Sequence, residues 1–204
     1  MVVNIPVWED YVSAYHREGF IVIPNHSSES NPKSLGYHDW QTPREYPLEN
    51  LLSEILATKK ASALLGYNTA DPSKPIWAVD IDLVKCLCED TSHVKNSNHS
   101  IACVALAREW RRNHFSDFRN LVTEVSLTVH GGIHAFFKAS DKNAVLKAMA
   151  PVLSIDSRIF IEEIKGRGRQ VLLPPSRIAD GTYFLLDCKG PRYLAEDFKI
   201  RELL

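Results

Sequence analysis

The apolar residues of the chain follow two different periods. In some stretches, such as 8–15, apolar side chains recur every three or four positions, which predicts amphipathic helices. Between these stretches lie short apolar runs that predict strands. We expect helices over 8–19, 48–58, 101–114 and 141–153, and strands over 20–24, 61–66, 76–83, 121–129, 133–138, 158–164 and 169–173. Mixed helices and strands, with a hairpin around the glycine pair at 131–132, indicate an α+β fold.

Two stretches lack such a period. Residues 25–47 are rich in Ser, Asn, Pro and His and predict a long surface loop. Residues 86–100 form a polar insertion. The helix after the insertion is expected to carry Arg108, Arg111 and Arg112 on its solvent-exposed side. The pattern therefore predicts one domain, residues 1–204, interrupted by the insertion at 86–100.

Composition narrows the class of protein. A chain of 204 residues with 45% hydrophobic content can bury one sizeable core. Its apolar runs fall far short of the roughly 20 residues of a membrane span, and we expect neither a signal peptide nor a membrane partner. The formal net charge of -1 argues against a surface that is basic throughout, so a nucleic-acid site has to be local. Four cysteines, three of them within 86–103, predict a reducing, cytoplasmic setting rather than a disulfide framework.

A pair of acidic residues ends the strand expected at 76–83. Alternate side chains of a strand share a face, so Asp80 and Asp82 project together while Val79 and Ile81 point into the core. Two carboxylates about 6–7 Å apart repel each other unless a cation lies between them, and their hard oxygens suit Mg²⁺ or Mn²⁺. Two solvated aspartates at the end of a strand are the alternative.

A second feature is the glycine turn that leads into the strand carrying His134. Glycine lets the backbone approach a bulky anion, and the imidazole of His134 then has a proton to donate to a triphosphate. A histidine in the core or on the surface of an ordinary hairpin is the alternative.

Acidic and basic residues alternate in a third segment, 162–169. Glu162 and Glu163 face opposite sides of a strand, so at most one of them joins Asp80 and Asp82. The basic residues stand two positions apart and are candidates to face phosphates: Lys165, Arg167 and Arg169. Taken alone, the segment is more typical of a solvated, charge-balanced hairpin.

In this order the three features resemble the archaeo-eukaryotic primase superfamily, in particular the bifunctional primase-polymerase domain of plasmid, phage and archaeal replication proteins. That family has a hydrophobic strand ending in two acidic residues one apart, then Thr-x-Ser-Gly-Gly-x-His, then an acidic-x-basic-Gly strand running into Pro-Pro-Ser. The matching residues are Asp80, Asp82, Thr128, Gly131, Gly132, His134, Glu163, Lys165, Gly166, Pro174, Pro175 and Ser176. The departures are His130 in place of Ser and Glu163 in place of Asp. The spacing to Pro174 favours Glu163 over Glu162, and the resemblance extends from about Tyr11 to Tyr183.

The resemblance implies a mixed or antiparallel sheet similar to that of RNA-recognition motifs, flanked by helices, with an N-terminal α/β subdomain. It also implies a template-dependent primase and polymerase whose partners are a single-stranded DNA template, a primer and NTP or dNTP. Asp80, Asp82 and Glu163 are then expected to bind two Mg²⁺ or Mn²⁺ ions. The expected nucleotide-binding residues are His134, Lys165, Gly131, Gly132, Thr128, Arg167 and Arg169. A further helical or helicase domain and a prokaryotic, plasmid or viral setting also follow from the resemblance.

The polar insertion and its flanks carry soft and borderline metal ligands: Cys86, Cys88, His93, His99 and Cys103. Structural zinc takes four Cys or His ligands, and some plasmid-encoded relatives carry a zinc-bound stem, so a zinc knuckle is a candidate. The Cys-x-Cys start differs from the common Cys-x2-Cys spacing. Burial of Cys103 in the core beside the following helix is the alternative.

Two other functions stay open at this point. One is a module that keeps the fold without activity and binds single strands or docks other replication proteins. The retained acids and His134 argue against that loss of activity. The other is a rolling-circle replication nickase, which usually needs a His-hydrophobic-His pair and a nucleophilic tyrosine. The sequence contains no His-x-His.

Overall fold

The computed structural model describes residues 8–27, 41, 47–88, 101–119, 124–129, 131–178 and 181–185. Its helices are α1 (Trp8–Arg17), α2 (Leu48–Thr58), α3 (Leu83–Leu87), α4 (Ile101–Arg119) and α5 (Lys142–Leu153). Its longer strands are β1 (Ile21–Pro24), β2 (Ala61–Leu64), β3 (Ile76–Ile81), β4 (Glu124–Leu127), β5 (Ile133–Lys138), β6 (Glu163–Lys165) and β7 (Gln170–Leu173). Three two-residue strands follow: β8 (Arg177–Ile178), β9 (Gly181–Thr182) and β10 (Phe184–Leu185).

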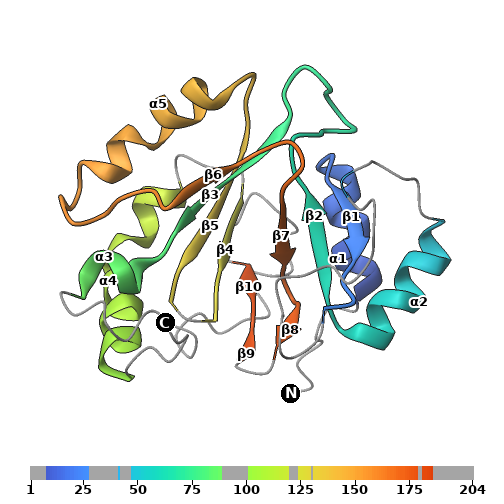
Figure 1. Cartoon of the computed structure of the whole chain (residues 1–204), viewed down its shortest axis with the longest axis horizontal. Helices are drawn as coiled ribbons and strands as arrows, with labels where there is room; N and C mark the ends of the chain where they lie inside the picture. Colours follow the sequence, from blue (N-terminus) through green and yellow to red (C-terminus); the bar gives the residue numbers. More distant parts are fainter. Residues whose placement is uncertain are drawn as a thin grey trace.

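Two antiparallel sheets contain most of the described strands, and β8 pairs with β9 in a third. The larger has the strand order β10-β4-β5-β3-β6, and the smaller has the order β1-β2-β7. Figure 1 shows α3, α4 and α5 beside the larger sheet and α1 and α2 beside the smaller one, with β7 between the two groups. The predicted α+β fold is confirmed, and the smaller sheet with its two helices forms the expected N-terminal α/β layer.

Strand alternation divides the core between the two faces of the larger sheet. Val79 and Ala135 point into a cluster that also contains residues of α3, α4 and α5. Ala78 and Phe136 point to the other face, into a cluster with residues of α1, α2 and the smaller sheet. Apolar residues cover both faces of the central strands β3 and β5, and this burial fixes their position and register.

The segment between β6 and β7 joins the two sheets. β6 pairs with β3 in the larger sheet, whereas β7 pairs with β2 in the smaller one, so the alternative of a simple hairpin over 162–173 is wrong. Gly66 allows this segment to pass closely, because a Cβ there would lie 2.3 Å from the Cα of Arg167. The chain therefore runs from β6, which carries Glu163, directly into β7 of the smaller sheet.

Some helix and strand boundaries differ from those predicted from the sequence. The strand expected at 76–83 ends at Ile81, because the side chain of Asp82 accepts hydrogen bonds from the backbone of Val84 and Lys85 and starts α3. The strand expected at 158–164 is reduced to Glu163–Lys165. Arg111 was expected on the exposed side of α4 and is instead buried. Most of the loop expected at 25–47 and of the insertion lies outside the described residues, and no helix in the described part of the chain is long and apolar enough to cross a membrane.

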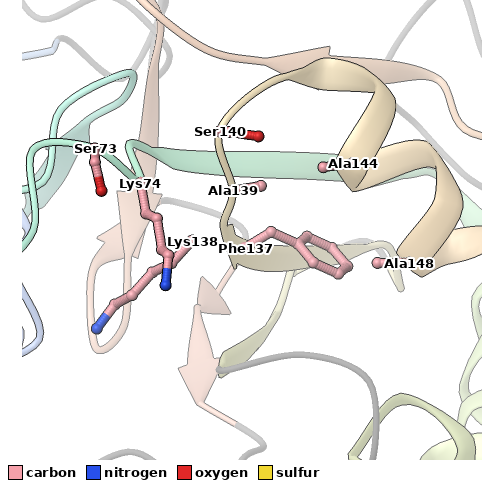
Figure 2. Close-up of a pocket in the computed structure, with 8 residues that line it drawn as sticks. All are labelled: Ser73, Lys74, Phe137, Lys138, Ala139, Ser140, Ala144 and Ala148. Atoms are coloured by element: carbon pink, nitrogen blue, oxygen red, sulfur yellow. The ribbon is translucent and has the colours of Figure 1, made fainter.

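A cavity of about 500 Å³ lies at the Lys138 end of β5, next to α5. Figure 2 shows the side chains of Lys74 and Lys138 on one side of it and the ring of Phe137 on the other. Both lysines already have acidic partners, since Lys138 pairs with Glu18 at 2.8 Å and Lys74 lies 4.0 Å from Asp71. The cavity is thus at the opposite end of β5 from His134, and its positive charges are balanced.

Candidate active site

The larger sheet brings the predicted acids and histidine into one row. Asp80 of β3 lies directly opposite His134 of β5 on one side and Glu163 of β6 on the other. Directly opposed residues in antiparallel strands project from the same face with their Cβ atoms about 5 Å apart. Ser126 of β4 lies opposite His134 and extends the row. The convergence expected of Asp80, His134 and Glu163 therefore follows from strand register.

Cations already surround the two central carboxylates. The Lys165 ammonium contacts Oδ2 of Asp80 and lies 3.8 Å from Oε2 of Glu163. Nε2 of His134 lies 3.6 Å from Oδ1 of Asp80. The guanidinium of Arg169 pairs with the other carboxylate oxygen of Glu163 at 3.3 Å. Because the side chains of Asp80 and Lys165 are largely buried, their charges interact more strongly than they would in water.

Asp82 has a different environment from Asp80. Its Oδ1 accepts the backbone N–H groups of Val84 and Lys85, at 3.1 and 3.2 Å. Its Oδ2 lies 3.7 Å from the ammonium of Lys85, which also contacts Glu162. The hydrogen bond that Lys85 donates to the carboxylate of Glu162 is the main reason why the pKa of Lys85 is raised. One oxygen of Asp82 thus caps a helix, and the other lies beside the ammonium of Lys85.

The two adjacent glutamates are separated by the direction of their side chains. Glu163 lies opposite Asp80 in the ladder, whereas Glu162 contacts Lys85 of α3. The backbone N–H of Glu162 donates to the carbonyl of Asp80 at 2.9 Å, which fixes the point where β6 begins to pair. This geometry supports the preference for Glu163 over its neighbour.

The donor set of the row fits hard divalent cations. Asp80 and Glu163 offer carboxylate oxygens side by side, and Asp82 adds a third carboxylate two residues along. As the side chains stand, no three Asp, Glu, His or Cys groups among the described residues lie close enough to share one ion. The Lys165 ammonium against Asp80 shows that this position accepts positive charge. Binding of a cation by these acids requires Lys165 to move off Asp80.

The glycine turn packs tightly against the end of β3. A Cβ on Gly132 would lie 2.9 Å from both the carbonyl oxygen of Ile81 and Oγ1 of Thr128. Thr128 closes the turn, because its Oγ1 accepts the N–H of Gly132 and its own N–H donates to the Gly132 carbonyl. Gly131 has a φ of 92°, which a residue with a side chain rarely adopts. Thr128, Gly131 and Gly132 thus shape the backbone beside Asp82, and their role in nucleotide binding stays a prediction.

The basic residues of the third segment do not act as one group. Lys165 and Arg169 contact the acidic row, whereas the guanidinium of Arg167 lies 5.6 Å from the centre of the Tyr67 ring. A cation over an aromatic face is a stabilising contact in its own right. Arg167 therefore joins the two layers and does not belong to the row.

Sequence reasoning missed Tyr183. Its ring stacks on the imidazole of His134, with the ring centres 6.1 Å apart and an angle of 29° between the planes. Burial, with a smaller contribution from Asp80, raises the pKa of Tyr183 to about 12. Its backbone N–H donates to the carbonyl of Ser176, in the Pro-Pro-Ser segment. The signal in the sequence was the position of Tyr183, seven residues after Ser176. No sequence rule predicts that the Tyr183 ring contacts His134.

The candidate zinc ligands fall into two groups. The thiols of Cys88 and Cys103 are hydrogen-bonded neighbours, and burial followed by this contact raises the pKa of Cys88 to about 11. Cys86 instead donates to the carbonyl of Phe160 at 3.7 Å, and burial raises its pKa. His93 and His99 lie outside the described residues.

Comparison with known proteins agrees with this arrangement of acids, turn and histidine. The family model described as bifunctional DNA primase/polymerase, N-terminal (Prim-Pol) matches residues 12–196. No curated protein matches the chain. The family match includes the acidic row, the glycine turn, the Pro-Pro-Ser segment and Tyr183, and covers most of the chain. The chain therefore belongs to the Prim-Pol family of bifunctional DNA primase/polymerase N-terminal domains.

Proposed function

We propose that this chain is a template-dependent DNA primase and polymerase that transfers a nucleotidyl group from NTP or dNTP to a 3′-hydroxyl. The observation that carries the proposal is the register that sets Glu163, Asp80 and His134 side by side on one face of the sheet. Family membership supplies the reaction class. A row of carboxylates next to a histidine suits a reaction in which charge develops on phosphate oxygens.

The residues of the row have distinct roles in this proposal. Asp80, Asp82 and Glu163 hold two Mg²⁺ or Mn²⁺ ions, which when bound supply positive charge for the attacking oxygen and the leaving pyrophosphate. His134 donates a hydrogen bond to the triphosphate, and the Tyr183 ring stacked on it restricts the orientation of the imidazole. Lys165 moves from Asp80 toward the phosphates when the acids take up their ions, and so stabilises the charge that develops there.

The decisive experiment incubates the protein with primed and with unprimed single-stranded templates, labelled nucleotides, and either Mg²⁺ or Mn²⁺. Extension of the primer that follows the template sequence supports a polymerase, and products on unprimed template support priming. Binding of the template with no incorporation under either metal contradicts the proposal and favours a module without activity.

Asp82 is both a helix cap and a proposed ligand, and one substitution separates these roles. Asn caps a helix as well as Asp does, so Asp82→Asn preserves the start of α3 while removing the negative charge. We expect extension to fall about 100-fold or more with the melting temperature almost unchanged. Unimpaired extension by this variant would limit Asp82 to a structural role.

The DNA contact is proposed to be local and assisted. With a net charge of -1 the chain has few lysines and arginines to spare for phosphates, and each phosphate contact requires one. Arg108 and Arg112 are exposed on α4 and are candidates for this contact, together with Arg119, whose side chain lies outside the described set. A helical or helicase domain, in the same protein or in trans, would supply further affinity in a plasmid, phage or other prokaryotic replication setting.

We further propose that zinc binds next to α3, with Cys88 and Cys103 as two of its ligands and the others drawn from Cys86, His93 and His99. The contact between the first two thiols supports this choice. Freshly purified protein is expected to contain about one zinc ion per chain, and Cys88→Ser should lose most of it. Cys86→Ser then tests whether the third thiol is also a ligand, since the Cys86 thiol faces the Phe160 carbonyl. Metal analysis that finds no zinc in the unmodified protein would rule the site out.

A further inference from the structure

The buried guanidinium of Arg111 has no part in the proposed chemistry as described so far. Arg111 lies on α4 and is 4% exposed, whereas Arg108, one turn earlier, is exposed. Burial, and to a smaller extent the charge of Arg108, lowers the pKa of Arg111 to about 10. Arginine is seldom buried without a paired charge, because taking its guanidinium out of water is costly.

No acidic side chain in the described part of the chain forms an ion pair with Arg111. Its Nη1 donates a hydrogen bond of 3.4 Å to the carbonyl oxygen of Gly132, and its Nε has no acceptor among the described residues. By comparison, Lys138 pairs with Glu18 and Arg158 with Asp156. Within the described part of the chain, the charge of Arg111 therefore has no counterion beside the glycine turn.

The turn is held between Arg111 and the acidic row. Gly131 packs on α4, since a Cβ there would lie 2.9 Å from the Cβ of Ala107. On the other side Gly132 packs against the carbonyl of Ile81, next to Asp82, and His134 follows two residues later. Any displacement of the Gly132 carbonyl is thus transmitted to the start of β5.

We propose that Arg111 is a positioning residue of the nucleotide site, and that its unpaired positive charge favours binding of the triphosphate above the turn. The inference rests on the proposed function and adds a residue to it. Arg111 holds the Gly132 carbonyl, and no carboxylate among the described residues pairs with its charge, which therefore remains available to attract an anion. A nucleoside triphosphate is the anion that His134 and Lys165 bind in the proposed function.

Two substitutions separate charge from hydrogen bonding. Arg111→Lys and Arg111→Gln both keep a donor for the Gly132 carbonyl, but only the lysine keeps the charge. In primer extension with dNTP or NTP as the varied substrate, Arg111→Gln should raise KM about tenfold and change kcat by less than about threefold, while Arg111→Lys stays closer to the unmodified protein. Arg17→Met, an exposed arginine on α1, is the control and should leave KM unchanged.

Measurements of thermal unfolding and of direct nucleotide binding distinguish the proposed role of Arg111 from a purely structural one. Because Arg111→Gln removes a buried charge without a counterion, the variant should melt within about 3 °C of the unmodified protein while binding a nucleoside triphosphate about tenfold more weakly. Its affinity for the nucleoside lacking phosphates should be unchanged. Wild-type triphosphate affinity in the folded Gln variant would overturn the inference, as would equal losses for nucleoside and triphosphate.

The proposed function and this inference fail in different ways. Should the unmodified protein bind triphosphate but never extend a primer, the reaction is wrong, and the binding comparison between Arg111→Gln and Arg111→Lys still decides the role of Arg111. Should the unmodified protein extend primers and Arg111→Gln show an unchanged KM, Arg111 has no part in nucleotide binding and the reaction stands. Loss of folding in both variants would also overturn the inference, since it would make Arg111 a structural residue.

Discussion

Replacing Asp80 by Asn is expected to lower primer extension by about 1,000-fold or more while the protein stays folded. Asp80 is the central member of the acidic row, between Glu163 and His134, and Asn has the same shape without the negative charge. Loss of about 4 kcal/mol of transition-state stabilisation, a reasonable figure for a carboxylate that binds a catalytic cation, corresponds to this factor. Single-turnover extension of a labelled primer at saturating nucleotide measures it.

The control for Asp80→Asn is Asp141→Asn. Asp141 caps α5 through a hydrogen bond from the N–H of Ala144, and Asn preserves such a cap. This variant should extend primers at the rate of the unmodified protein. Both variants should melt cooperatively, because Lys165 retains Glu163 as a neighbour when Asp80 loses its charge. Extension by Asp80→Asn within tenfold of the unmodified rate would remove Asp80 from the site.

Glu163→Gln is expected to lower extension by about 100-fold or more, and Glu162→Gln by less than about threefold. The two positions are adjacent in sequence and identical in chemistry, so the pair forms its own matched control. The difference arises because Glu163 lies opposite Asp80, whereas Glu162 contacts Lys85. Removing one carboxylate from a shared cation site weakens the binding of that cation, so the loss at Glu163 should be partly recovered at higher Mn²⁺ concentration.

A titration of metal concentration for both variants provides the measurement. A larger loss at Glu162 than at Glu163 would exchange their roles and would place the third ligand next to α3. Equal and small losses would leave Asp80 and Asp82 as the acids that matter. In either case the register of β6 against β3 would no longer describe the site.

Periodicity predicted most of the local elements, whereas the choice of candidate site residues also depended on the family resemblance. The alternation over 76–81 predicted that Asp80 and Val79 point to opposite faces of the strand. The glycine pair predicted the hairpin that carries His134. What periodicity could not give is the pairing of β6 with β3, since a run of three residues has no periodic signal and its partner lies more than 80 positions away. The partner of β7 in the other sheet was hidden for the same reason.

Two local errors also have physical causes. The sequence around Asp82 continues the apolar-acidic alternation of a strand. The side chain of Asp82, however, accepts hydrogen bonds from nearby backbone N–H groups, and a helix begins there instead. Arg111 was placed on the exposed side of α4 because arginine is normally solvated. Its burial depends on the glycine turn of a distant hairpin, which no helical period reveals.

Because β6 is the last strand in the order of the larger sheet, the residues of the acidic row do not all resist local unfolding equally. β3 and β5 are each hydrogen-bonded on both sides, whereas β6 is three residues long and pairs with β3 alone in the larger sheet. Short outer strands open at far lower free energy than inner ones. Transient detachment would carry away Glu163 and Lys165 together, one negative and one positive charge, leaving Asp80 and His134 in place. In the proposed function, fraying of this one short strand would interrupt the chemistry reversibly and would release Ile164 from the edge of its core cluster, while β3 and β5 stay paired.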